Sequence, residues 1–343
     1  MAERSLAGKT ILVTGGAGFI GSNLIHFFLR SQPDCRVINL DKLTYAGNPD
    51  NLKDIEQDPR YEFVLGDIRD RETVALLFDR ADMVVHLAAE THVDRSIVDA
   101  GEFVLTDVYG SFILFEALRQ AEIEVFLHVS TDEVYGSRDQ GFFSEEDPLN
   151  PSSPYAASKA GADRLGYSYV VTYGLPIVII RPSNNYGPYQ YPEKFIPLFA
   201  TNALEDKKLP LYGQGTNVRD WLFVEDHCRA IDLILRKGTL GEVYNVGANA
   251  EVPNLEVAET IVDILGKPRE LITLVQDRLG HDRRYALECT KLHSLGWKPE
   301  QTFPRGLERT VSWYRDNPDW WHKIKDQSEE FRQFHDAYYS DRK

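Results

Sequence analysis

The sequence predicts an α/β protein with a doubly wound parallel (Rossmann) sheet and a smaller mixed α/β lobe. Short apolar runs alternate with helical patterns through the first half of the 343-residue chain, as expected for parallel strands joined by crossover helices. The runs at 11–13 (ILV) and 177–180 (IVII) are apolar without alternation, which is typical of strands buried on both faces. A glycine-rich turn separates the first run from the first helical pattern.

The elements follow from these patterns in chain order. Strands are predicted at 10–14, 37–41, 62–65, 83–87, 125–130 and 177–181, and helices at 22–30, 71–80, 103–120 and 155–173. Beyond Pro182, residues 184–197 are rich in Asn, Tyr and Pro and predict a loop, followed by helices at 224–235 and 255–265 and a surface helix or frayed tail at 323–343. We therefore expect a Rossmann domain over residues 1–182, with some later segments returning to it, and a substrate-binding lobe over 183–343.

The charge and the cysteines exclude several classes of protein. Lys and Arg number 38 and Asp and Glu 53, for a formal charge of −15, so we expect no nucleic-acid partner. Cys35, Cys228 and Cys289 are far apart without metal-ligand spacing, so we expect no metal site, reduced thiols and a cytoplasmic location. No run resembles a signal peptide or a membrane span, so we expect no membrane partner.

Residues 14–21 (TGGAGFIG) carry a dinucleotide-binding pattern between the first strand and the first helix. Gly16, Gly18 and Gly21 fit the spaced dinucleotide fingerprint, and Gly15, Gly18 and Gly21 fit its short-chain variant. Glycines let the backbone approach a pyrophosphate, which the helix N-terminus attracts. The alternative is a turn that only allows close helix packing, and the strand and helix on either side favour the dinucleotide site.

Asp41, at the end of the second strand, predicts which dinucleotide binds. A carboxylate there accepts hydrogen bonds from the ribose hydroxyls and repels a 2′-phosphate, so we expect NAD rather than NADP. The neighbouring Lys42 weakens that preference. Asp67, after the third strand, is placed either near the adenine or as a plain helix N-cap.

Tyr155 and Lys159 lie near the start of a predicted helix, after the cap and first-turn residues 152–154. Their i, i+4 spacing places the hydroxyl and the ammonium on one face. A nearby cation favours the phenolate, which predicts a lowered tyrosine pKa and a general base. An ordinary helix with a surface lysine is the alternative, but it leaves the glycine pattern unexplained.

Thr131, Asp132 and Glu133 follow the fifth strand, where ligands bind in doubly wound sheets. Two adjacent carboxyl groups in a cleft suit an acid–base pair, of which one donates a proton and the other accepts one. Taken alone, the segment fits a solvated acidic turn at least as well.

These motifs together resemble the extended short-chain dehydrogenase/reductase family, and within it the dTDP-glucose 4,6-dehydratases. The resemblance extends from about residue 9 to about residue 315. Its motifs are residues 130–136 (STDEVYG), 41–48 (DKLTYAGN), 86–96 (HLAAETHVDRS), 183–189 (SNNYGPY), 192–197 (PEKFIP), 218–221 (VRDW) and 280–285 (GHDRRY).

The resemblance implies a hydro-lyase that converts dTDP-glucose into dTDP-4-keto-6-deoxyglucose and water, with tightly bound NAD that is regenerated in each turnover. It implies that Tyr155 takes the 4-hydroxyl proton, with Lys159 keeping it acidic and Thr131 bonding the oxygen at carbon 4. It further implies that Glu133 removes the proton from carbon 5 and that Asp132 protonates the departing 6-hydroxyl.

The resemblance also supplies binding residues and a homodimer. Besides the catalytic residues, the implied NAD contacts are Gly15, Gly18, Phe19, Ile20, Gly21, Asp41, Lys42, Thr44, Asp67, Ile68, Leu87, Ala89, Thr91, Thr106, Tyr155, Lys159 and Asn185. The implied nucleotide-sugar contacts are Thr91, Thr131, Asn184, Lys194, Phe195, Pro210, Tyr212, Arg219, Asn254, Arg278 and His281.

Several alternatives stay open at this point. Arg219 could form an ion pair with Asp220 or Glu225, and His281 could be a satisfied loop histidine. The short segments before Tyr155 and at 265–271 leave a uridine sugar open beside the thymidine sugar. A 4-epimerase or decarboxylase of the same fold would share Tyr155, Lys159 and the glycines but would not need Asp132 and Glu133. An NAD-binding regulator would need no catalytic residues.

Overall fold

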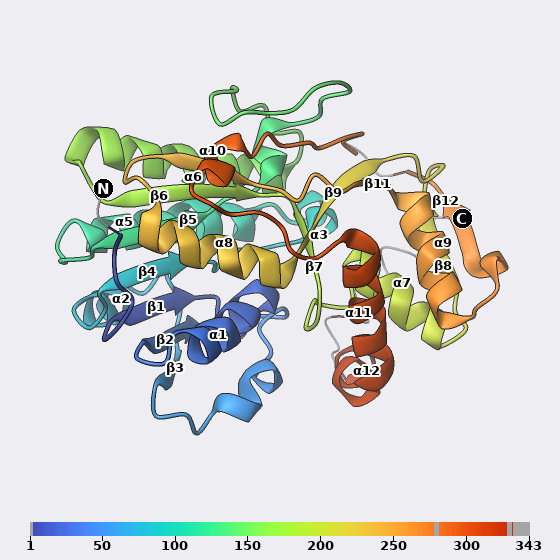
Figure 1. Cartoon of the computed structure of the whole chain (residues 1–343), viewed down its shortest axis with the longest axis horizontal. Coiled ribbons are helices and arrows are strands. Elements are labelled where there is room, and N and C mark those ends of the chain that lie inside the picture. The colour runs from blue at the N-terminus through green and yellow to red at the C-terminus, as the bar shows by residue number, and fades with distance from the viewer. Residues whose placement is uncertain (1–2, 278–280, 328–330, 332–343) are drawn as a thin grey trace.

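A computed structural model describes residues 3–277, 281–327 and 331, and its first lobe is built on a seven-stranded parallel sheet (Figure 1). The strand order is β10-β6-β5-β4-β1-β2-β3. The strands are β1 (Thr10–Thr14), β2 (Arg36–Asp41), β3 (Tyr61–Leu65), β4 (Met83–His86), β5 (Val125–Val129), β6 (Ile177–Pro182) and β10 (Val243–Val246). The order reverses between β1 and β4, which is where doubly wound sheets bind ligands. The predicted fold class and the six predicted strands are confirmed.

Helices cover both faces of this sheet. Helices α1 (Phe19–Ser31) and α8 (Val224–Lys237) pack side by side on the near face in Figure 1. Helices α2 (Arg71–Phe78), α5 (Ser111–Leu118) and α6 (Pro154–Tyr173) supply apolar side chains to the core on the other face. Shorter elements are η1 (Pro49–Ile55), α3 (Val93–Val98), α4 (Gly101–Phe103), η2 (Val104–Gly110), η3 (Asp132–Tyr135) and α10 (Thr290–Ser294). Apolar burial on both faces explains why the central strands are continuously hydrophobic.

The second lobe has its own core and two small sheets. One sheet is β11-β9-β7 and the other β12-β8. Helices α7, α9 and α11 pack against one another over these sheets (Figure 1). The elements are β7 (Asn184–Tyr186), α7 (Phe195–Leu204), β8 (Leu209–Tyr212), β9 (Val218–Phe223), β11 (Glu251–Pro253), α9 (Asn254–Leu265), η4 (Arg269–Leu271), β12 (Ile272–Val275), α11 (Phe303–Asp316) and α12 (Pro318–Gln327).

Three sequence-based expectations need correction. The predicted loop at 184–197 begins as strand β7, because its backbone pairs with β9. The predicted helix at 103–120 is instead α4, the π-helical turn η2 and α5, and such widened turns often occur at functional sites. The predicted surface tail is partly core: Lys325 is buried and donates a hydrogen bond to Asn202.

A buried ion pair fixes α6, the helix of Tyr155, to the sheet. Arg181 on β6 donates two hydrogen bonds of 2.9 Å to the carboxylate of Asp163 on α6, and both side chains are almost fully buried. We expect Asp163→Asn to lower the free energy of unfolding by about 3–5 kcal/mol, because it leaves a buried cation without its counter-charge. Urea denaturation measures this loss.

The matched control is Glu62→Gln, which breaks the exposed pair of Glu62 with Arg80. Exposed pairs contribute about 0–1 kcal/mol. Equal losses in the two variants would contradict the anchoring role of the buried pair.

Within the described part of the chain, no helix is both long enough and apolar enough to cross a membrane.

Candidate active site

Two connected cavities lie between the lobes. The first, of about 300 Å³, lies at the carboxyl ends of the parallel strands. The second, of about 180 Å³, extends into the second lobe. Both are lined by Glu133, Asn184, Asn185, Gln190 and Lys194, so the cavities join. A long ligand can therefore lie with one end in each lobe.

The glycine-rich turn forms one wall of the first cavity. Gly15 has φ +73°, and a Cβ there would be 2.7 Å from the backbone nitrogen of Ala88. A Cβ on Gly21 would be 2.3 Å from the carbonyl oxygen of Gly15. Gly18 caps α1 without a side-chain hydrogen bond, and the first turn of that helix has no acidic residue. This open helix N-terminus suits the pyrophosphate of a dinucleotide.

Asp41 stands at the end of β2, beside this turn. Its carboxylate oxygens accept hydrogen bonds from the backbone nitrogens of Ala17 (2.9 Å) and Leu43 (2.8 Å). Burial raises the pKa of this carboxyl, and the two N–H groups partly offset that effect. Each oxygen keeps acceptor capacity for a ribose hydroxyl.

The structure excludes one of the two placements of Asp67, that of a helix N-cap. Lys42 forms an ion pair with Asp67 at 2.9 Å, and Arg69 forms another at 2.8 Å. The N-cap of α2 is Asp70 instead, whose side chain accepts from Glu72. Asp67 therefore lines the first cavity and is not a helix cap.

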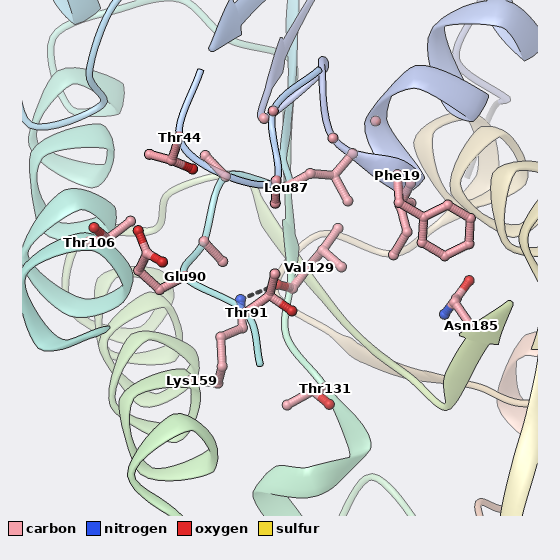
Figure 2. A pocket seen from close by; sticks show the side chains of 18 of the residues that line it. Phe19, Thr44, Leu87, Glu90, Thr91, Thr106, Val129, Thr131, Lys159 and Asn185 are labelled. Atoms are coloured by element: carbon pink, nitrogen blue, oxygen red, sulfur yellow. Dashed lines mark hydrogen bonds between the residues drawn. The ribbon is translucent and has the colours of Figure 1, made fainter. Parts of the chain in front are cut away.

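Tyr155 and Lys159, the predicted catalytic pair, lie in the first turns of α6. Ser153 caps the helix by accepting from the backbone nitrogen of Ala156 at 3.1 Å. Lys159, one turn after Tyr155, donates to the carbonyl oxygen of Val129 at 2.8 Å, the dashed line in Figure 2. This bond ties the lysine to the end of β5. Tyr155 and Lys159 both line the first cavity.

The predicted lowering of the Tyr155 pKa by Lys159 is wrong for this structure. The pKa of Tyr155 is raised well above its ordinary value, mainly by burial and then by the charges of Glu133 and Asp107. Hydrogen bonding with Thr131 favours the phenolate, but less strongly. The ammonium of Lys159, held by a backbone carbonyl, does not outweigh these effects.

Thr131, Asp132 and Glu133 form a turn directly after β5. Thr131 caps η3 and donates to Oδ1 of Asp132 at 3.2 Å. Asp132 is only 2% exposed, so the alternative of a solvated acidic turn does not hold for this residue. Its pKa is raised well above the ordinary value by burial and by the charges of Glu133 and Asp220. The arrangement therefore offers a proton donor next to a second carboxyl group.

The second cavity collects the residues predicted to hold the nucleotide. It is lined by Asn184, Lys194, Phe195, Pro210, Tyr212, Arg219, Asn254 and His281. The side-chain oxygens of Asn184 and Asn254 are buried without a hydrogen-bond partner among the described residues, which suits donors of a ligand. Arg278 lies outside the described residues.

Two alternatives to ligand binding were left open for this cavity: an ion pair for Arg219 and a satisfied loop histidine for His281. They have different outcomes. Arg219 donates to the carbonyl oxygens of Val218 and Asp282 and lies 4.5 Å over the ring of Tyr285, while Glu225 pairs with Arg30. The proposed ion pairs of Arg219 are therefore not what holds it. His281 contacts the carboxylate of Asp277 at 2.5 Å, which fits a satisfied loop histidine that also lines the cavity.

A family model described as GDP-mannose 4,6-dehydratase matches residues 12–310 of the chain. The chain belongs to the GDP-mannose 4,6-dehydratase family.

Relatives and solved structures agree with this membership. The chain is 52% identical to the low-salt glycan biosynthesis protein Agl12 of Haloferax volcanii, with 89% of this chain and 98% of that protein covered. It is 50% identical to a dTDP-glucose 4,6-dehydratase of an Actinoplanes species, with 91% and 99% covered. The crystal structure of DesIV, a dTDP-glucose 4,6-dehydratase from Streptomyces venezuelae with NAD bound, superimposes with a TM-score of 0.90 at 49% identity, with 92% and 99% covered.

Two carboxyl groups beside the first cavity, those of Glu90 and Asp107, were not predicted from the sequence. Burial raises the pKa of Glu90 to about 7 and that of Asp107 to about 6. Asp107 accepts from the backbone nitrogen of Glu90 and from the hydroxyl of Ser158, and Figure 2 shows Glu90 beside Thr106. Glu90 lies inside the motif at 86–96. Its place in that motif was the sequence feature that could have indicated a residue of the site. Over the described residues, no group of His, Cys, Asp or Glu could hold a metal ion.

Proposed function

We propose that the protein is an NAD-dependent dTDP-glucose 4,6-dehydratase. It is a hydro-lyase that converts dTDP-glucose into dTDP-4-keto-6-deoxyglucose and water. The observation that carries this proposal is the buried Asp132, whose pKa its surroundings raise, next to Glu133 and in one cavity with Tyr155 and Lys159. Relatives of that name at about 50% identity, one of them solved with NAD, support it.

The residues of the first cavity fit NAD. The backbone of Gly15, Gly18 and Gly21 and the start of α1 would hold the pyrophosphate. Asp41 would hold the adenosine ribose, and Lys159 the nicotinamide ribose. The chemistry that bound NAD supplies is reversible hydride transfer, which allows oxidation at carbon 4 and later reduction at carbon 6. NAD is unchanged over the cycle and stays bound.

Oxidation at carbon 4 requires a base for the hydroxyl proton. Tyr155 takes this proton, and Thr131 bonds the same oxygen. Burial raises the pKa of Tyr155, and bound NAD would supply a positive charge that favours the phenolate.

Elimination across carbons 5 and 6 requires a base and an acid. The ketone at carbon 4 makes the proton on carbon 5 acidic, and Glu133 removes it. Asp132, whose neutral form burial favours by raising its pKa, gives its proton to the departing 6-hydroxyl. Each of these contributions is worth about 10²–10⁴-fold in rate.

The second lobe binds the nucleotide part of the substrate. Lys194, which lines both cavities and donates to Thr91 at 3.1 Å, and Arg219 suit phosphate oxygens. Tyr212 and Pro210, with the unpartnered amide oxygen of Asn254, suit the base. Thymidine is the proposed nucleoside, and uridine is the alternative that the assay must separate.

Incubation of the purified protein with dTDP-glucose, without added cofactor, tests the proposal. We expect loss of one water by mass spectrometry and a new methyl doublet from carbon 6 in the proton NMR spectrum. Reaction of UDP-glucose alone would keep the mechanism and change the base. Epimerisation or decarboxylation of a sugar nucleotide would replace the dehydratase, and binding without turnover would indicate a regulator.

We also propose a homodimer formed through η2 and α6. These elements pack together and expose several large apolar side chains, which are Val104, Leu105, Tyr109, Tyr167, Val171 and Tyr173. Neighbouring exposed apolar groups of this kind mark protein interfaces. The buried free thiols of the three cysteines support a reducing, cytoplasmic location.

The double change Leu105→Asp and Val171→Asp should halve the native mass, because it places charges in the proposed interface. Light scattering coupled to size-exclusion chromatography measures the mass. Leu274→Asp, at a side chain 50% exposed in the second lobe, is the control and should leave the dimer intact. A parent protein with the mass of a monomer would contradict the proposed dimer.

A further inference from the structure

Three loops from distant parts of the chain line the first cavity. The loop after β2 contributes Thr44 and the loop after β4 contributes Thr91, both of which are labelled in Figure 2. The loop after β7, in the second lobe, contributes Tyr191 and Lys194. The strand ends and the glycine-rich turn line the same cavity. A ligand in this cavity therefore lies between the sheet of the first lobe and loops of both lobes, and movement of these loops apart would open the cavity.

A buried ion pair joins two of these loops across the lobes. Arg95 on α3, just after the β4 loop, donates from Nε to Oε1 of Glu193 at 2.9 Å and to Oε2 at 3.1 Å, and from Nη2 to Oε1 at 2.7 Å. Glu193 directly precedes Lys194. The side chain of Glu193 is 1% exposed and that of Arg95 14%. Because the guanidinium is a rigid fork of donors, the pair fixes the relative orientation of the two loops as well as their distance.

Tyr45 connects the third loop to this ion pair. The guanidinium carbon of Arg95 lies 3.9 Å from the centre of the Tyr45 ring, which is a favourable position for a cation. The hydroxyl of Tyr45 donates to the carbonyl oxygen of Thr91, and its ring meets that of Tyr191 edge-on at 5.6 Å between centroids. Arg95 itself lines neither of the two cavities. It therefore lies behind the wall of the first cavity and can affect a ligand there only through the loops that it joins.

We propose that Arg95 and Glu193 are positioning residues that hold these loops together around NAD and keep the cofactor bound through the whole reaction. This role rests on the proposed function, in which the cofactor reduced at carbon 4 must itself reduce carbon 6. Loss of reduced cofactor between the two steps would leave an oxidised sugar and an empty enzyme. The ion pair and bound NAD both favour closed loops, so formation of either one strengthens the other.

Release of NAD from preloaded protein tests this role without any sugar. Protein loaded with radiolabelled NAD is mixed with an excess of unlabelled NAD, and rapid gel filtration follows the label that stays with the protein. Arg95→Met keeps the apolar part of the side chain and removes the fork, and Glu193→Gln keeps the shape and removes the charge. Each variant should release NAD faster by about 10–100-fold, a usual size for coupling between two sites.

The double variant Arg95→Met and Glu193→Gln separates one shared contact from two independent effects. It should release NAD no faster than the quicker single variant, because both changes break the same contact. The matched control is Glu205→Gln, which breaks the ion pair of Glu205 with Lys325 in the second lobe. Neither of these two side chains lines a cavity. The control should lower the midpoint of thermal unfolding and release NAD at the parent rate.

Turnover supplies a second measurement. With dTDP-glucose and no added cofactor, Arg95→Met should stop early and release reduced nicotinamide together with a sugar nucleotide oxidised at carbon 4, both detectable by mass spectrometry. Added NAD should restart the reaction of this variant. The parent protein should complete its turnovers and release no reduced nicotinamide.

Release of NAD at the parent rate by both single variants would overturn the proposed role, and so would effects that add in the double variant. Equally fast release by Glu205→Gln would overturn it as well, because the effect would then follow general stability. If Arg95→Met does not fold, Arg95→Lys, which keeps the charge but not the fork, takes its place in the comparison. The proposed function fails separately, when the parent protein retains NAD but dehydrates neither dTDP-glucose nor UDP-glucose.

Discussion

Tyr155→Phe should lower the turnover number of the dehydratase by about 10²–10⁴-fold, the usual contribution of a general base. The phenol oxygen lies in the same cavity as the strand-end turn after β5, and phenylalanine keeps the ring but cannot accept a proton. The loss should affect oxidation at carbon 4, the first step. Stopped-flow absorbance should therefore show no reduced nicotinamide during turnover.

Ser168→Ala is the control on the same helix, because its exposed hydroxyl bonds only the carbonyl of Leu165 among the described residues. It should keep the parent rate. A Tyr155→Phe variant that still forms reduced nicotinamide at the parent rate would assign the base to another residue.

Asp132→Asn and Glu133→Gln should each lower the turnover number by a similar factor of about 10²–10⁴, but at a later step. Both variants keep Tyr155 and Lys159, so oxidation at carbon 4 continues and reduced nicotinamide should accumulate. The two differ at carbon 5. In deuterium oxide, Asp132→Asn should still exchange the proton on carbon 5, because Glu133 is intact, whereas Glu133→Gln should not.

The raised pKa of Asp132 adds a pH dependence. Burial and the charge of Glu133 favour the neutral carboxyl, and only that form donates a proton. Activity should therefore be retained as the pH falls toward neutral and lost as the pH rises through the raised pKa. The rate of Asp132→Asn should lack this alkaline decline. The same decline in both proteins would assign it to another group.

Much of the first lobe could be predicted from local patterns. Strands buried on both faces are continuously apolar, and the turn at Gly15, Gly18 and Gly21 leaves its spacing in the sequence. The π-helical turn η2 could not be predicted, because an amphipathic pattern does not distinguish a widened turn from a regular one. The partial burial of the C-terminal region was missed for a related reason. Lysine is usually exposed, but Lys325 forms an ion pair with Glu205 and a hydrogen bond with Asn202 in the second lobe.

The sequence by itself determined the chemical groups of the site and the segments that carry them: Tyr155 and Lys159 one helical turn apart, and Asp132 with Glu133 after a strand. These are short-range facts, set by helix period and strand length. Only the tertiary structure decided the direction in which the pKa values of these groups are shifted. The pKa values of Tyr155 and Asp132 depend on burial and on charges brought from β9 and η2, because electrostatic energies depend on distance and solvent access rather than on position in the chain.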